Sequence, residues 1–241
     1  MVKINPLIED EGVGAKARRL IHGSMGHLDP FVIFDEYQIF RDAYFPRHPH
    51  SGFEGFQILM EGRTIYRDNQ GKEGAIDPGD VRRFVAGDGF EHSEEPDYDG
   101  TVRGYLLWIK IPRGYRNTPV IFKEERSANI PVVEKNNLKI RMIMGEQSPV
   151  ETMTPVEWNL VESGETDGTI AIELDPENNG FIYVSSGGVE NDGLLIGKGE
   201  GAIMKGSGKV NLKVLPSTEM VVVKGRKLNE PIVQEGHLVH W

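Results

Sequence analysis

Cysteine is absent from this chain of 241 residues. Its absence excludes disulfide bonds, thiolate nucleophiles and thiolate metal ligands, so nitrogen and oxygen atoms would have to hold any bound metal ion. The sequence also has no run of about 18 apolar residues and no N-terminal leader with a basic head and a small-residue cleavage site. We therefore expect a cytoplasmic protein that does not enter a membrane.

Basic residues are in the minority, because 27 Lys and Arg stand against 37 Asp and Glu, for a formal net charge of −10. No stretch of Lys and Arg is dense enough to follow a phosphate backbone, so direct nucleic-acid binding is not expected. An acidic surface does not exclude a protein partner, and that class of function stays open.

Long helical patterns are missing as well. No window of twelve or more residues keeps a clear apolar repeat of 3.6 residues, and Pro or Gly interrupts most candidates. Short runs rich in branched and aromatic residues instead predict strands at 56–60, 64–67, 81–85 and 102–111. Together with 29 glycines, which indicate many turns, these runs predict an all-β fold.

The stretch 112–131 is polar, contains proline and has little patterning, so we place the crossing between two domains there, at 1–120 and 121–241. A weak similarity in pattern between two segments, one in each half of the chain, supports two related domains. The first half has FQILMEGRTIY followed by GAIDPGDVRRFVAGDGFEHSEE, and the second has FIYVSSGGVE followed by GLLIGKGEGAIMKGSGKVNLKVL. Both read as strand, tight turn, strand, glycine-rich turn and strand.

Two pairs of donor residues concentrate the chemistry in the first half. His48 and His50 stand at i and i+2 in HPHSGFE, and His92 and Glu94 have the same spacing in FEHSE. Alternate side chains of a strand share a face, so each pair can point in one direction. Two adjacent strands that present such pairs to a barrel interior would surround one point with three imidazoles and a carboxylate. That donor set suits a divalent transition metal ion.

These segments resemble the cupin superfamily, whose first motif runs HxH, a short gap and Glu, and whose second ends in PxG followed by His. The closer resemblance is to the pirin family. It is carried, in order, by EGVGAKARRLI, LDPFVIFDEY, HPHSGFEGFQILMEG, AGDGFEHSEEP and GYLLWIKIP, and later by MTPVEW, GFIYVSSGGV and GRKLNEPIVQEG. The resemblance implies two cupin-type β-barrel domains of the jelly-roll kind.

The resemblance also bears on the carboxylate ligand. The general cupin motif would use Glu54, four residues after His50, whereas the pirin pattern uses the Glu two residues after the last His, here Glu94. It therefore implies the metal ligands His48, His50, His92 and Glu94. Glu54 is left as a group that orients an imidazole or interacts with a bound substrate.

The remaining candidates carry less weight. Glu95 faces the other side of a regular strand and is expected to be a solvated charge. His22 and His27 lie in a glycine-containing loop, and His237 and His240 lie close to the end of the chain, where fraying is common. None of these four histidines is expected to bind metal. The second domain has no histidine where it echoes the donor pairs, so we expect no metal site there.

Two departures from the family pattern affect the expected cavity. HPHSGFEG stands where pirins usually read HPHRGFET, and RRFVAGDGFEH stands where they often read QWMTAGRGILH. The lost Arg and Thr and the acidic Asp88 and Glu91 are expected to change the polarity near the metal. Substrate identity therefore does not carry over from the family.

The function that the resemblance implies is a metal-dependent dioxygenase similar to quercetin 2,3-dioxygenase. A flavonol-type enol would coordinate the ion, lose a proton to Glu94 and be opened by O2. The implied ion is Fe(II), although nitrogen and oxygen donors also suit Ni, Cu, Mn, Co and Zn. The alternative is a metal-containing regulatory protein that binds a protein partner without physiological turnover.

Overall fold

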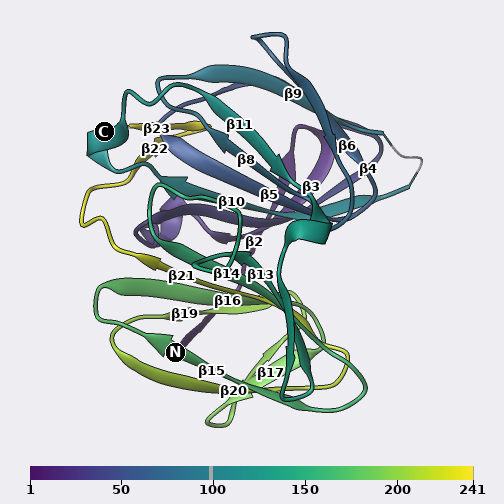
Figure 1. Cartoon of the computed structure of the whole chain (residues 1–241), viewed down its shortest axis with the longest axis vertical. Coiled ribbons are helices and arrows are strands. Elements are labelled where there is room, and N and C mark those ends of the chain that lie inside the picture. Colours follow the sequence, from purple (N-terminus) through teal and green to yellow (C-terminus); the bar gives the residue numbers. More distant parts are fainter. Residues whose placement is uncertain (98–99, 241) are drawn as a thin grey trace. The chain divides into compact units, whose positions relative to one another are not determined.

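The computed structural model describes residues 1–97 and 100–240, and this part of the chain is built from strands (Figure 1). Helix occurs there only as three short 3-10 turns, Gly23–Met25, Arg113–Tyr115 and Ser127–Asn129. The predicted all-β fold is confirmed, and the four predicted runs correspond to β5 (Phe53–Glu61), β6 (Thr64–Asp68), β8 (Val81–Val85) and β10 (Val102–Lys110). No helix in the described residues is long and apolar enough to cross a membrane.

The chain divides into two compact units, and each takes residues from both halves of the sequence. One unit consists of residues 1–6 and 128–227, and the other of residues 7–127 and the segment from 228 onward. The change of unit at 127/128 falls inside the stretch 112–131, where we expected the crossing. The contiguous domains 1–120 and 121–241 stay a prediction. The compact units differ from them in that each contains one end of the chain together with a distant segment.

The unit formed by 7–127 and 228–240, here called the histidine unit, contains a ten-stranded antiparallel sheet. Eight strands follow the order β11-β8-β5-β10-β4-β9-β6-β7, β3 pairs with β4, and β2 pairs with β3. A separate hairpin, β22-β23, completes this unit. The bounds not yet given are β2 (Leu7–Glu11), β3 (Val13–Ile21), β4 (Phe31–His50), β7 (Glu73–Ile76), β9 (Phe90–Pro96), β11 (Ile121–Glu125), β22 (Val233–Glu235) and β23 (Leu238–His240).

Strand β4 is 20 residues long and takes part in several pairings of the sheet. Its first part, which reads FVIFDEYQIF and favours a strand, pairs with β10 and β3, and its last part pairs with β9. The register shifts between Phe45 and His48. Such irregularities bend a strand and redirect its side chains, so the end of β4 turns its histidines toward β9.

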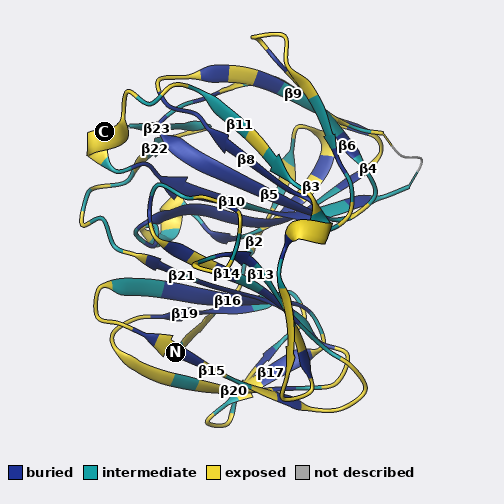
Figure 2. Ribbon diagram, viewed as in Figure 1, coloured by how far each residue is buried: buried dark blue, intermediate teal, exposed yellow. Residues whose placement is uncertain are grey.

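An apolar cluster surrounds the end of β4 and forms a wall of the site. Its buried members are Val32, Ile33, Phe53, Phe84, Ala86, Phe90, Trp108 and Val239. Figure 2 shows the same burial along β5, β8 and β10. Burial of each large apolar side chain is worth about 1.5–3 kcal/mol, so packing stabilises this wall.

The unit formed by 1–6 and 128–227 has sheets of seven and four strands, in the orders β1-β19-β16-β21-β14-β13-β12 and β15-β20-β17-β18. Its core contains branched and sulfur-containing side chains such as Val161, Ile182, Met204 and Val222. The strands are β1 (Val2–Ile4), β12 (Val132–Lys135), β13 (Leu138–Met144), β14 (Val156–Ser163), β15 (Gly168–Leu174), β16 (Asn178–Ser186), β17 (Gly188–Asn191), β18 (Leu194–Gly197), β19 (Glu200–Met204), β20 (Gly208–Val214) and β21 (Glu219–Arg226).

Candidate metal centre

Three imidazoles converge where β4 pairs with β9. His48 lies directly opposite His92 in the antiparallel register, and His50 lies two residues further along β4 on the same face. The Nε2 atom of His92 is 3.0 Å from Nε2 of His50 and 3.1 Å from Nε2 of His48. The structure thus brings together the three histidines that spacing predicted.

Backbone carbonyl groups fix the tautomers of two of these rings. Nδ1 of His48 lies 2.7 Å from the carbonyl oxygen of Pro46, and Nδ1 of His50 lies 3.4 Å from that of His237. A carbonyl oxygen only accepts, so each Nδ1 carries the proton and each Nε2 presents a lone pair. Nε2 of His92 has at most one proton and cannot satisfy both lone pairs.

A divalent ion fits this cluster of nitrogens. Metal–nitrogen bonds of about 2.1 Å at right angles would hold two nitrogens about 3.0 Å apart. The observed separations of 3.0 and 3.1 Å match that spacing. In metal-binding histidines, the ring N–H that does not face the metal commonly donates a hydrogen bond to a carbonyl oxygen, as Nδ1 of His48 and of His50 does here. Both the donor chemistry and the spacing of the nitrogens therefore suit a divalent ion.

Burial keeps the imidazoles of His50 and His92 neutral. His50 and His92 are each 3% exposed. Burial, followed by the neighbouring His48, lowers the pKa of His50 well below its ordinary value. Burial, followed by His50 and His48, lowers the pKa of His92 in the same way. A metal ligand must be the neutral ring, so little proton displacement opposes metal binding near pH 7.

Glu94, the fourth predicted ligand, lines the same cavity as the three histidines. It lies two residues beyond His92 on β9, opposite Phe45 of β4 and Tyr66 of β6. Its Oε1 atom accepts a hydrogen bond of 3.2 Å from Nη1 of Arg82. The carboxylate thus lines the cavity of the imidazoles and is held by a guanidinium group, but it is not part of the close cluster of possible metal ligands.

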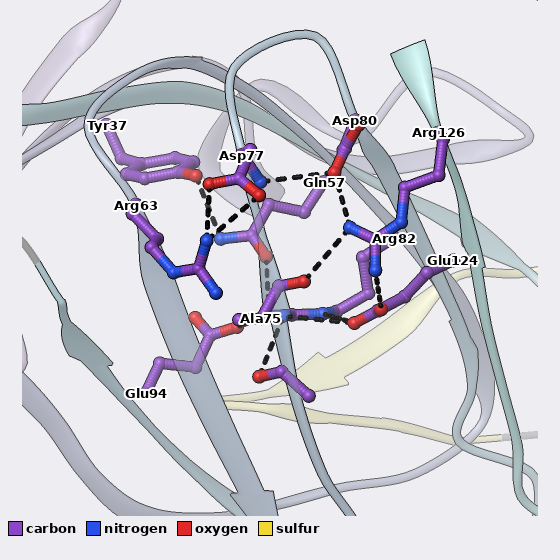
Figure 3. A network of polar contacts seen from close by, with 11 residues as sticks. Tyr37, Gln57, Arg63, Ala75, Asp77, Asp80, Arg82, Glu94, Glu124 and Arg126 are labelled. Carbon is purple, nitrogen blue, oxygen red and sulfur yellow. Dashed lines mark hydrogen bonds and ion pairs between the residues drawn. The ribbon is translucent and has the colours of Figure 1, made fainter. Parts of the chain in front are cut away.

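Arg82 is the centre of a buried polar network (Figure 3). Besides Glu94, it donates to Gln57 Oε1 at 3.2 Å and to Glu124 Oε1 at 3.3 Å, and its guanidinium lies 4.2 Å from the ring centre of Tyr66. Gln57 in turn donates to the hydroxyl of Tyr37 at 2.8 Å. Burial, followed by the charge of Glu94, raises the pKa of Tyr37. Arg82 is the first residue of the RRFVAG segment that departs from the family pattern.

Other predicted carboxylates lie elsewhere. Glu54 is fully buried and accepts two hydrogen bonds from Arg83, at 3.1 and 2.8 Å, and it is not among the residues lining the cavity. Glu95 is exposed and pairs with Arg67, in line with its predicted surface role. Asp88 and Glu91 are both exposed and are not among the residues that line the cavity, so their expected effect on the polarity near the metal stays a prediction. The turn and strand position that carry them face solvent.

Sequence reasoning missed His237. Each of His48, His50 and His237 places one ring nitrogen within 4.8 Å of the others, which is close enough for a shared ion. Burial, followed by His48, lowers the pKa of His237 to about 4. The one available signal was weak: His237 directly follows the last family block, GRKLNEPIVQEG, and no spacing rule connects it to residues 187 positions earlier.

The histidines open into a small cavity of about 60 Å³. Its apolar lining includes Phe84, Leu106 and Trp108. Its other end is charged: Arg19 donates to Asp35 at 2.8 and 2.9 Å. Burial, partly offset by Arg19, raises the pKa of Asp35 to about 6. The cavity therefore joins a nitrogen-rich end to an end that can bind polar groups.

The all-β fold and the histidine cluster define a cupin-type protein with a candidate metal site. The chain belongs to the pirin family: the family model "Pirin" matches residues 13–109. It is 33% identical over 253 residues to Pirin-1 of Arabidopsis thaliana, a match covering 98% of this chain and 86% of that protein. The predicted resemblance is confirmed.

A second relative and a solved structure carry an enzyme name. A putative quercetin 2,3-dioxygenase of Pseudomonas aeruginosa is 30% identical over 247 residues, covering 95% of this chain and 87% of the relative. The crystal structure of a quercetin 2,3-dioxygenase from Acinetobacter baumannii matches with a TM-score of 0.90 at 23% identity, covering 99% of this chain and 90% of that one. This structural match confirms the two-domain cupin-type fold.

Proposed function

We propose that the protein is a metal-dependent dioxygenase that opens a flavonol-type enol with O2. The observation that carries the proposal is the convergence of three imidazole Nε2 atoms, 3.0 and 3.1 Å apart, at one end of a cavity with apolar walls. The enzyme names of two similar proteins support the reaction class. His48, His50, His92 and Glu94 would hold the ion, with Fe(II) as the favoured metal.

When bound, a divalent ion of this kind supplies Lewis acidity toward an enolate oxygen and the redox chemistry that a reaction with O2 requires. The protein supplies the geometry. His48 and His50 point their lone pairs inward because carbonyl groups hold their Nδ1 protons. The rings of Phe84 and Trp108 line the cavity and exclude water, which strengthens electrostatic interactions inside it.

Glu94 is the proposed base. Its place on the cavity wall puts a carboxylate near the position where an enol would bind, and Arg82 holds one of its oxygens at 3.2 Å. That hydrogen bond orients the carboxylate, and proton transfer to it needs a substrate hydroxyl that a bound ion would acidify. A flavonol 3-hydroxyl meets that need.

Oxygen uptake with a flavonol, measured on metal-loaded protein, tests the proposal. We expect turnover in the wild type, loss of bound metal and activity in His50→Ala, and about 10²–10⁴-fold slower turnover in Glu94→Gln, the usual contribution of a positioned base. His22→Ala is the control, because the His22 imidazole hydrogen-bonds to the nearby Ser24 in a loop and is not among the residues that line the cavity. Metal-replete wild-type protein that consumes no oxygen would favour the regulatory alternative.

A further inference from the structure

The last described segment of the chain forms a hairpin against the metal centre. Strands β22 and β23 pair with each other at three positions each, and the turn between them holds His237. Leu238 of β23 also forms an isolated parallel bridge with Ser51. Val239 N donates to the carbonyl oxygen of Ser51 at 2.9 Å, directly beside His50. The side chain of Val239 is 2% exposed and joins the apolar cluster around Trp108.

Gly52 makes this close approach possible. Its φ is +81°, and a Cβ atom there would lie 1.9 Å from the carbonyl oxygen of Val239. Glycine alone satisfies both requirements, the left-handed backbone and the missing side chain. The hairpin and the end of β4 are therefore fitted to each other.

The hairpin brings two groups to the histidines. The His237 ring centre is 4.9 Å from that of His48 and 5.5 Å from that of His50, and its carbonyl oxygen accepts from Nδ1 of His50. The carbonyl fixes the tautomer of a ligand, while the imidazole is itself within ligand range.

We propose that His237 is a fourth imidazole ligand of the metal centre and that it yields its coordination position to a substrate oxygen. The inference rests on the metal centre of the proposed function and not on the oxygenase reaction. Two observations favour an exchangeable ligand over a fixed one, the size of the cavity and the place of the hairpin outside the ten-stranded sheet.

The cavity of about 60 Å³ is far below the roughly 300–1,000 Å³ of sites that hold drug-sized molecules. A bicyclic or tricyclic enol therefore enters only if a wall moves. The walls on β4, β9 and β10 belong to a ten-stranded sheet, whereas His237 belongs to a two-stranded hairpin. The hairpin contributes no strand to that sheet and meets β4 through few backbone contacts, at Ser51, so it opens at lower cost than a strand inside the sheet.

Cobalt(II) titration of the apoprotein tests the ligand. We expect His237→Ala to weaken cobalt binding by about tenfold or more, a loss at least as large as that of residues that only orient a ligand, and to change the visible ligand-field spectrum. Added imidazole should restore the wild-type spectrum in this variant. The matched control is His240→Ala on the same hairpin, whose ring lies 3.6 Å from Glu235.

A chelating enol tests the exchange. We expect 3-hydroxy-4-pyranone to bind the cobalt-loaded His237→Ala variant about tenfold more tightly than the wild type, because in the variant the pyranone has no imidazole to displace. If the alanine variant does not melt cooperatively, His237→Gln provides the same readings with a side chain of similar size. A wild-type spectrum and wild-type cobalt affinity in a folded variant would overturn the inference.

The two proposals fail separately. Absence of oxygen uptake with an altered His237→Ala spectrum refutes the oxygenase and leaves the fourth ligand standing. Oxygen uptake by the wild type with an unaltered His237→Ala spectrum supports the oxygenase and refutes the fourth ligand.

Discussion

At the scale of single residues, the unusual feature of the site is Arg82, a charged side chain that is almost completely shielded from solvent. The side chain of Arg82 is 1% exposed and makes ion pairs with Glu94 and Glu124 at 3.2 and 3.3 Å. A buried guanidinium is tolerated because it is paired with carboxylates that are themselves partly buried, and removal of one partner leaves the others uncompensated. The network therefore links fold stability to the orientation of Glu94.

We expect Arg82→Met to lower the free energy of unfolding by about 3–5 kcal/mol, the usual effect of breaking a buried ion pair. We also expect weaker metal binding by about 10–100-fold, because Glu94 loses the group that orients it. Urea unfolding and equilibrium dialysis measure the two effects. Arg67→Met, which removes an exposed arginine paired with Glu73 and Glu95, should leave both readings near wild type.

Asp35 provides a pH-dependent signal from the far end of the cavity. Burial raises its pKa from 3.8 to about 6, so the native state holds a proton that the unfolded chain has already lost. The contribution of Asp35 to the free energy of unfolding therefore falls as pH rises from about 4 to about 6. At about 1.4 kcal/mol per pKa unit, the loss is about 3 kcal/mol.

We expect Asp35→Asn to gain stability relative to wild type as pH rises through this window. Denaturant midpoints of both apoproteins between pH 4 and pH 7 measure the difference. Parallel profiles for the two proteins would contradict the expectation.

At the scale of elements, the pairing of β4 with β9 was predictable and the hairpin was not. The i, i+2 spacing of His48 with His50 and of His92 with Glu94 follows from the alternation of strands, and local sequence is enough to find it. His237 reaches the site through a contact between residues 187 positions apart, which no local pattern encodes. The hydrogen bond from Arg82 to Glu94 likewise depends on which strands become neighbours, so the sequence alone does not predict it.

Gly52→Ala should separate the hairpin from β4. We expect it to weaken cobalt binding and to lower stability, because the added Cβ would meet the carbonyl oxygen of Val239 at 1.9 Å. The matched control is Gly71→Ala, because Gly71 has the same φ of +81° and nothing within 4 Å of the added Cβ. Both variants carry the backbone cost of about 1–2 kcal/mol, so the difference between them reports the clash alone.

Titration of the two apoproteins with cobalt, together with thermal melts, gives this difference. Equal losses in the two glycine variants would show that the hairpin does not sit against Gly52.

At the scale of the whole molecule, two units with separate cores share one chain. The composition of each unit could not be predicted, because the exchange of residues 1–6 and of the segment from 228 onward depends on long-range pairing such as that of β1 with β19. The change of unit at 127/128 lies inside the weakly patterned stretch 112–131, and the crossing between contiguous domains there stays a prediction. The candidate metal centre lies wholly within the histidine unit.

Metal should therefore stabilise one unit only. At a free metal concentration 100 times Kd, binding adds about 2.7 kcal/mol to the stability of the form that binds it. We expect slower amide exchange in peptides from 7–127 and from the hairpin 232–240 when the metal is added. Peptides from 128–227 should exchange at the same rate with and without metal, and a uniform slowing across both units would contradict the expectation.

The exchange of chain ends also sets an order of events during synthesis. The ribosome makes His48, His50 and His92 first, then residues 128–227, and only afterward the turn that carries His237. At about 5–20 residues per second, the intervening stretch takes roughly 5–20 s. An ion captured in that interval would meet only the early histidines, and maturation of the centre would wait for the emerging tail.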